Sequence, residues 1–294
     1  MRQLLFSVLF FPFLIINAQS LKDVTYTPKD MELFSAYVNF YQSKKDKPIN
    51  ELILETGKYF LGKPYIASTL ETTKEERLTV NLREFDCTTF VESCFALSLM
   101  LMDEGFDAHQ SSEDNFLIFC QKLQEIRYRQ GNINDYASRL HYFSDWIYDN
   151  ENKHFVKDFT ELLGGKKNNI SVSFMSEHSD YYKQLTANPS LIEKIAKDEK
   201  EINSRAYYYM PKADISVHKS KIKNGDIIAF TTNIPGLDIS HVGYAIWQKN
   251  ELYLMHASLS EKKIVISQQS LINYTRAIKR HTGIMIARPL SLVP

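Results

Sequence analysis

The sequence lacks the features that mark several common classes of protein. Its 294 residues carry 35 basic and 35 acidic side chains, so there is no net positive field to attract nucleic acid or an acidic membrane. After the N-terminal run, no segment stays apolar for the roughly 20 residues that a membrane-spanning helix needs. Internal repeats and low-complexity segments are also missing. These absences argue against nucleic-acid-binding, membrane-embedded and repeat proteins.

The one long apolar run lies at the N-terminus. Arg2 supplies a positive charge, the residues from 4 to 16 are almost wholly apolar, and Ala18 offers a small residue for cleavage before Gln19. This pattern is typical of a secretion signal and is short for a membrane span. We therefore expect a signal peptide over residues 1–18, and an exported, periplasmic or secreted mature chain without a membrane span.

Cysteine is scarce, with three residues in the chain. An odd number in an exported protein leaves at least one thiol unpaired. Cys87 and Cys94 fall in one expected helix, about 10 Å apart, which exceeds the roughly 7 Å that a disulfide can bridge. Cys94 and Cys120 either form a disulfide or remain two inert buried thiols. Cys87 is the natural candidate for a free thiol.

The apolar spacing changes along the chain. It predicts helices over 30–41, 49–60, 87–103, 115–127, 139–150 and, with a break at Pro189, 181–204; it predicts strands over 226–231, 239–247, 252–257, 263–267 and 283–288. Helices followed by antiparallel strands indicate an α+β fold. We expect a leader and helix over 19–48, then a single catalytic domain over 49–294, helical to about 215 and β from about 216.

Cys87 stands where a polar loop becomes an apolar helix. Asp86 and Thr88 can cap this helix, and Phe90 and Val91 begin its buried side. The positive end of the helix dipole and the free backbone N–H groups favour the thiolate, which is the nucleophilic form. The alternative is a small buried cysteine in a core helix.

Two histidines occupy mirrored positions of an expected hairpin. His241 begins one strand, His256 ends the next, and the pair Lys249-Asn250 suits the turn between them. If this sheet packs on the start of the cysteine helix, the three residues meet. A zinc site built from Asp238, His241, His256 and His281 is a weaker alternative, because their spacing is not typical of metal ligands.

Several segments together resemble one family. The sequence Asp-Cys-Thr-Thr-Phe-Val at 86–91 resembles the Asp-Cys-Ser-Gly-Phe-Val signature of the NlpC-like cell-wall cysteine hydrolases, a papain-like superfamily. Segments 224–230, 240–244 and 255–258 resemble its Gly-Asp strand, its histidine strand and the strand of its third catalytic residue. Segment 58–65 is similar to the helix and turn that bring a tyrosine, here Tyr65, to the site. Thr88 and Thr89 replace Ser-Gly.

The long separation of Cys87 and His241 implies a large, mainly helical insertion in a papain-like core. Segments 127–129, 138–147, 205–212 and 236–241 resemble the N-acetylmuramoyl-L-alanine amidase-like branch of the superfamily. This resemblance implies hydrolysis of the amide between the lactyl group of muramic acid and L-alanine, in ordinary or anhydro-muropeptides. Within the insertion, Arg139, His141 and Tyr142 offer groups that suit a sugar or a peptide carboxylate. The alternative is a structural role, with the arginine paired.

The expected site follows from these patterns. Cys87 would be the nucleophile, His241 the base and His256 its orienting partner, with the Cys87 N–H and the Tyr65 hydroxyl holding the oxyanion. The expected substrate-binding residues are Tyr65, Asp86, Thr88, Arg139, His141, Tyr142, Asp238 and Ser240. We expect a monomer that acts on muropeptides without metal or cofactor. The alternatives are an endopeptidase that cuts a D-Glu–diaminopimelate bond, a metal-dependent amidase, and a non-catalytic muropeptide-binding module.

Overall fold

The computed structural model describes residues 21–44, 46–71, 73, 75–168 and 171–291. The expected signal peptide, 1–18, lies outside these residues. The helices are α1 (Pro28–Tyr41), α2 (Ile49–Tyr59), α3 (Cys87–Leu101), α4 (Ser112–Arg127), α5 (Phe143–Asn152), α6 (Phe174–Glu177), α7 (Lys183–Ala187), α8 (Ser190–Asn203), α9 (Ile215–His218) and α10 (Leu271–Ala277). The strands are β1 (Val24–Thr25), β2 (Leu78–Thr79), β3 (Val156–Asp158), β4 (Lys166–Asn168), β5 (Tyr207–Pro211), β6 (Ile227–Thr232), β7 (Ile239–Gln248), β8 (Glu251–Ser258), β9 (Lys263–Ile266) and β10 (His281–Pro289).

The main sheet is antiparallel and has the order β4-β5-β10-β6-β7-β8-β9, with β3 paired to the end of β10. The fold is therefore α+β, with N-terminal helices and a C-terminal antiparallel sheet, as predicted. The five predicted strands are confirmed as β6 to β10. The apolar pattern did not predict β3, β4 and β5, which belong to the stretch expected to be helical. Each is at most five residues long, and each is a strand because it pairs with β10 or with its short neighbour.

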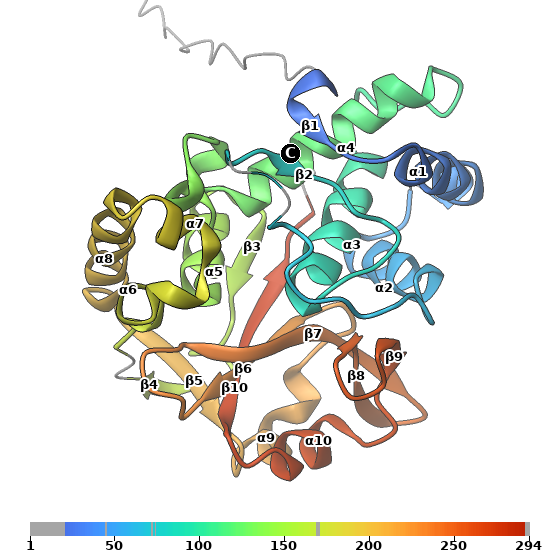
Figure 1. The fold of residues 1–294 in the computed structure, drawn as a ribbon. Helices are drawn as coiled ribbons and strands as arrows, with labels where there is room; N and C mark the ends of the chain where they lie inside the picture. Colours follow the sequence, from blue (N-terminus) through green and yellow to red (C-terminus); the bar gives the residue numbers. More distant parts are fainter. Residues whose placement is uncertain (1–20, 45, 72, 74, 169–170, 292–294) are drawn as a thin grey trace, which may run out of the picture.

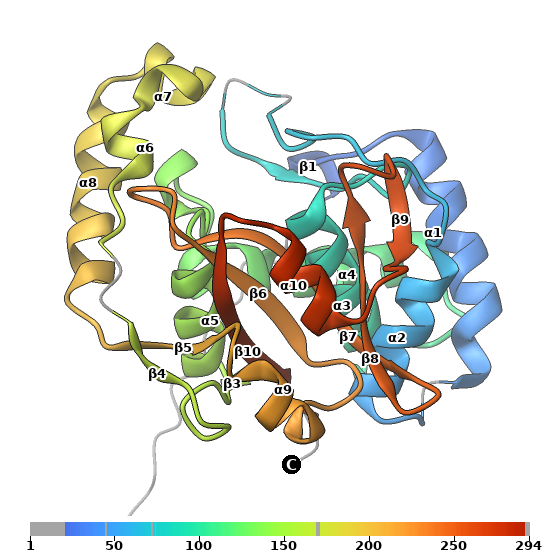
Figure 2. The same cartoon turned by 90° about the horizontal axis from the view of Figure 1, so that it is seen from below.

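Helices cover both faces of this sheet. Helix α3 packs on β7 and β8 from one side, and α10 packs on β8 and β10 from the other. Figure 2 shows α10 in front of the sheet, with α3 and α4 behind it. The two faces bury separate apolar clusters, one with Phe90 and Tyr244, the other with Phe230 and Leu271. The Tyr244 hydroxyl donates to the Val91 carbonyl at 2.7 Å, which ties β7 to the start of α3.

The β7–β8 hairpin has the turn that the sequence predicts. Lys249 and Asn250 both have positive φ, 46° and 69°, as a two-residue type I′ turn requires. Behind the turn, Tyr244 pairs with Met255, and Trp247 with Leu252. This register places the start of β7 beside the end of β8.

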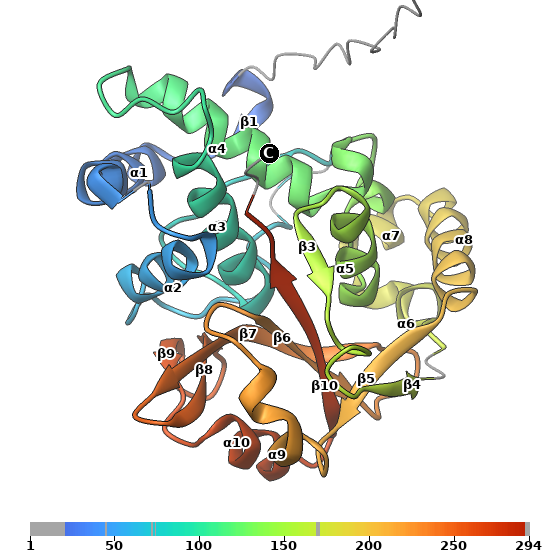
Figure 3. The ribbon, with the colours of Figure 1, turned by 180° about the vertical axis from the view of Figure 1, so that it is seen from behind.

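The insertion between α4 and β6 contributes α5 to α8, which lie to one side of α3 and α4 (Figure 1; seen from behind in Figure 3). The helix expected from residue 139 begins at Phe143 instead. Residues before it are extended because Arg139 forms a bridge with Tyr128 and the Leu140 N–H bonds the Arg127 carbonyl. The predicted break at Pro189 is confirmed, since it separates α7 from α8. Over the described part of the chain, no helix has the length and apolar character to cross a membrane.

Candidate active site

The two hairpin histidines are in contact. His241 Nε2 lies 2.7 Å from His256 Nδ1, and the rings are nearly perpendicular at 84°. The predicted proximity of these two residues is confirmed. Because Nε2 of His241 is engaged by His256, its Nδ1 is the nitrogen left to exchange a proton with a reacting group.

Gly243 makes room for this contact. It follows His241 on the same face of β7, and a Cβ on it would lie 2.8 Å from the Cβ of His256. Any larger residue would push the two strands or the two imidazoles apart. Steric crowding therefore explains why this position of the Ser-His-Val-Gly-Tyr segment is a glycine.

Cys87 is the first residue of α3 and lies against the same part of β7. The backbone N–H of Val242, the residue after His241, hydrogen-bonds its sulfur. The Thr88 hydroxyl and N–H also interact with the thiol, and these three groups lower its pKa. The structure thus brings Cys87 to the strand that carries His241, as the sequence predicted.

The pKa of the Cys87 thiol is raised, whereas the sequence led us to expect a lowered pKa and a thiolate. Burial, followed by the negative charge of Asp86, raises the pKa of the thiol to about 12. Burial also lowers the pKa of His256 to about 4 and that of His241 well below its ordinary value. The site therefore holds a neutral thiol and neutral imidazoles, because a buried pocket disfavours the charged form of each group.

Asp86 and Thr89 form the cap of α3. The Asp86 carboxylate accepts the Thr89 N–H at 2.8 Å, and the Thr89 hydroxyl accepts the Asp86 N–H at 2.9 Å. This reciprocal capping box fixes the first turn of α3. The two threonines that replace Ser-Gly are thereby explained: Thr89 completes the cap, and Thr88 contacts the sulfur. Asp86 thus caps α3 and, through its negative charge, raises the pKa of the Cys87 thiol.

Two tyrosines flank the thiol. Tyr65 is held by a bond from its N–H to the Lys262 carbonyl at 2.9 Å, and burial, then the charge of Cys87, raises its pKa to about 12. Tyr274 of α10 was not predicted. Its ring centre lies 5.2 Å from that of His256, and burial, then Cys87, raises its pKa to about 12. No pattern in the sequence pointed to Tyr274, since α10 itself was not predicted.

The insertion residues expected to bind substrate are engaged within the protein. Arg139 is buried and bonds both carboxylate oxygens of Glu76, at 3.0 and 2.9 Å, and Glu71 at 3.0 Å. His141 Nε2 contacts the Tyr136 carbonyl at 2.8 Å. The Tyr142 hydroxyl donates to Glu199 at 2.7 Å. These contacts match the structural alternative, and those of Arg139 anchor the loop that follows Tyr65.

Asp238 and Ser240 lie at the start of β7. Asp238 is buried and accepts the N–H groups of Ser144 and Ile239, each at 2.7 Å, so it joins β7 to the first turn of α5. Ser240 is the extra residue of a β-bulge, because Phe230 of β6 pairs with His241 and the next β6 residue, Thr231, pairs with Ile239. Its hydroxyl oxygen is buried and has no partner among the described residues. Bulges of this kind often re-aim side chains next to active sites.

Cys94 and Cys120 are buried free thiols. Among residues 21–291, apart from the few that the structure does not describe, no group of three or more His, Cys, Asp or Glu side chains is placed to hold a metal ion. Asp238, one of the ligands of the zinc alternative, is instead bound to the α5 backbone.

The structure places a cysteine at the start of a helix against the strand that carries one of two bonded histidines. The chain belongs to the AmiA-like family, described as N-acetylmuramoyl-L-alanine amidase-like, whose model matches residues 55–284.

Several solved structures are similar to this chain. An N-acetylmuramoyl-L-alanine amidase from Bacteroides uniformis is 38% identical, with a TM-score of 0.75, over 83% of this chain and 99% of that one. A Bacteroides fragilis protein, proposed to be a xylanase, is 41% identical, with a TM-score of 0.73, over 80% and 99%. A Legionella pneumophila protein with 23% identity and a TM-score of 0.65, over 90% and 97%, shares the fold. A search of curated proteins gave no match.

Proposed function

We propose that this protein is an exported, monomeric, cysteine-dependent amidase that hydrolyses the N-acetylmuramoyl-L-alanine bond of muropeptides, including anhydro-muropeptides. The observation that carries the proposal is the meeting of Cys87, at the start of α3, with the β7 strand whose His241 is bonded to His256 at 2.7 Å. Family membership supports the choice of bond.

The proposed reaction starts from the neutral thiol and imidazole. His241 Nδ1 takes the thiol proton as Cys87 Sγ attacks the amide carbonyl carbon, so that no free thiolate accumulates. The imidazolium then donates this proton to the nitrogen of the departing L-alanine, and the C–N bond breaks to leave a thioester on Cys87. Water, activated by His241, hydrolyses the thioester and restores the thiol. The neutral His256 ring holds His241 in the required orientation throughout.

Negative charge develops on the carbonyl oxygen during each attack. The Cys87 N–H at the start of α3 and the Tyr65 hydroxyl are the donors that we assign to it. The half-buried Tyr65 keeps its proton in this role because its pKa is raised to about 12. No metal or cofactor takes part in this scheme.

Product analysis with defined muropeptides tests the proposal. We expect the wild-type protein to release the stem peptide with a free L-alanine amine, and Cys87→Ala to release none while keeping its melting temperature. Cys120→Ala is the matched control, because it removes a buried thiol outside the site and should keep turnover. Cleavage between D-Glu and diaminopimelate, chelator-sensitive turnover, or full activity of Cys87→Ala would each contradict the proposal.

A further inference from the structure

A recess lies directly beside His256, one of the two bonded histidines. This His256 cavity has a volume of about 420 Å³ and is lined by His256 and Tyr274, by the turn after β8, by β9, by the segment between β9 and α10, and by the end of α10. Its volume falls within the range of about 300–1,000 Å³ that is usual for ligand sites. Because His256 also orients His241, the cavity and the catalytic centre share a wall.

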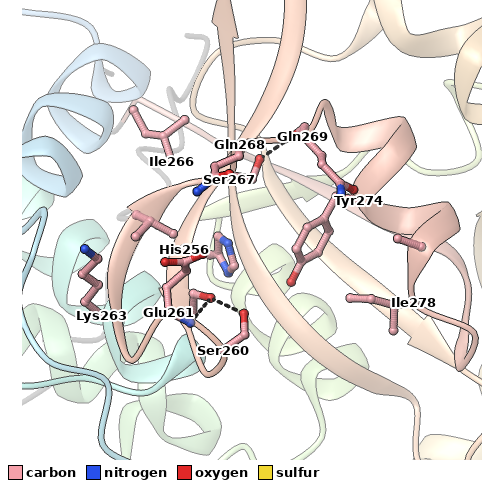
Figure 4. A pocket seen from close by; sticks show the side chains of 13 residues that line it. His256, Ser260, Glu261, Lys263, Ile266, Ser267, Gln268, Gln269, Tyr274 and Ile278 are labelled. Atoms are coloured by element: carbon pink, nitrogen blue, oxygen red, sulfur yellow. Dashed lines mark hydrogen bonds between the residues drawn. The ribbon is translucent and has the colours of Figure 1, made fainter.

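The two sides of the cavity differ in character. Figure 4 shows Tyr274 and Ile278 on one side, Glu261 and Lys263 on the other, and His256 between them. Glu261 and Lys263 are exposed, and neither has an ion-pair partner among the described residues. The cavity therefore presents an apolar aromatic wall opposite one acid and one base.

The position of the cavity indicates which half of the substrate it receives. His241 must protonate the departing nitrogen, so the amine-bearing half of the substrate lies on the histidine side of the thiol. The acyl half, with the sugar, then lies on the side of the thiol that faces away from the histidines. A cavity walled by His256 is accordingly on the side of the peptide.

The charges favour the same half. A stem peptide that contains glutamate and diaminopimelate carries carboxylates and an ammonium group, whereas an amide-linked muramoyl group has no charge. We propose that the His256 cavity is a subsite for the peptide stem, in which Lys263 faces a carboxylate, Glu261 faces the ammonium group and Tyr274 packs on the peptide backbone. This subsite rests on the proposed function for its assignment to the leaving half of the substrate.

Kinetics with paired substrates test the subsite. The substrates are muramoyl-L-alanine, the muramoyl tripeptide that ends in diaminopimelate, and the same tripeptide with its carboxylates amidated. We expect Lys263→Gln to lower kcat/KM for the free-acid tripeptide about twofold to fivefold, the usual size of an exposed ion pair, and to leave the other two substrates unchanged. The loss should shrink at high salt. The matched control is Lys262→Gln, since Lys262 is the neighbouring lysine and does not line the cavity.

Binding separates a failure of the subsite from a failure of the proposed function. Titration calorimetry of Cys87→Ala with the free tripeptide L-alanyl-γ-D-glutamyl-diaminopimelate should show binding that Lys263→Gln or Glu261→Gln weakens and Lys262→Gln does not. If the wild-type protein cleaves no muropeptide but this pattern is seen, the cavity holds the peptide and the amidase proposal fails. If the wild-type protein cleaves muropeptides and the 262 and 263 variants behave alike with every peptide, the subsite is refuted and the amidase proposal stands.

Discussion

Gly243 lets the two strands that carry His241 and His256 lie close together, and we predict that Gly243→Ala uncouples the pair. The new Cβ would lie 2.8 Å from both the Cβ of His256 and the carbonyl oxygen of Met255. Neither atom is the flexible end of a side chain, so β8 itself has to move. The backbone of Gly243 does not have positive φ, so crowding alone is responsible.

The size of the effect follows from these distances. An ordinary contact for the new Cβ begins at 3.4 Å, which requires a displacement of roughly 0.6 Å. The same displacement would stretch the 2.7 Å bond between His241 and His256 beyond the usual limit of about 3.2 Å. Misplacement of a catalytic group on this scale lowers kcat by about tenfold to a hundredfold. Crowding a packed core costs about 1–3 kcal/mol of the free energy of unfolding.

The assay is kcat for peptide release, measured together with thermal unfolding by circular dichroism. Gly105→Ala is the control, because its Cβ would meet the flexible end of Asp103 at 3.2 Å and Ile118 at 3.6 Å, and it should match the wild type. A Gly243→Ala protein with wild-type kcat and melting temperature would refute the steric argument.

Three further predictions concern charge and burial. Asp86→Asn keeps a capping oxygen but removes the charge that raises the Cys87 pKa. Iodoacetamide should therefore alkylate the thiol of this variant faster, while the melting temperature stays unchanged. Asp86→Ala also removes the cap, so its free energy of unfolding in urea should fall by about 1 kcal/mol. The Cys87 thiol and the His241 imidazole are both neutral at every pH between the lowered pKa of His241 and the Cys87 pKa of about 12. We therefore expect kcat/KM to fall only at acid pH, as His241 becomes protonated. An alkaline decline near the ordinary thiol pKa of 9.0 would contradict this. Arg139→Ala leaves the Glu76 carboxylate, whose side chain is 6% exposed, without its cationic partner, so urea unfolding should show a loss of about 3–5 kcal/mol. A raised KM at normal stability would assign Arg139 to substrate binding instead.

The secondary-structure elements that could be predicted are those that are specified by local sequence signals. Helix α3 has a capping residue, Asp86, and an apolar body, and the β7–β8 hairpin has a turn pair with the required positive φ. Short elements escape prediction because tertiary pairing forms them. Strand β5 exists because Met210 and Pro211 pair with β10, and Arg139 is extended because Tyr128 bridges to it.

The candidate site also has features that the sequence predicts and features that depend on tertiary contacts. The contact of His241 with His256 and the approach of Cys87 to the His241 strand could be predicted, because the histidines belong to one hairpin and the cysteine to a helix start. The thiol pKa could not be predicted, since the helix start is visible in the sequence but the burial that outweighs it is not. Tyr274 comes from a seven-residue helix on the far face of the sheet, and the ion pairs of Arg139 join residues more than 60 positions apart. Such contacts leave no trace in local spacing.

The most direct test of the central claim follows one oxygen atom. An anhydro-muropeptide is hydrolysed in ¹⁸O-labelled water, and the products of the wild-type and Cys87→Ala proteins are compared by mass spectrometry. The account predicts one ¹⁸O in the lactyl carboxylate of the muramic acid product, an unlabelled stem peptide with a free L-alanine amine, and no products from Cys87→Ala. Label in a peptide carboxylate, or turnover without the Cys87 thiol, would contradict it.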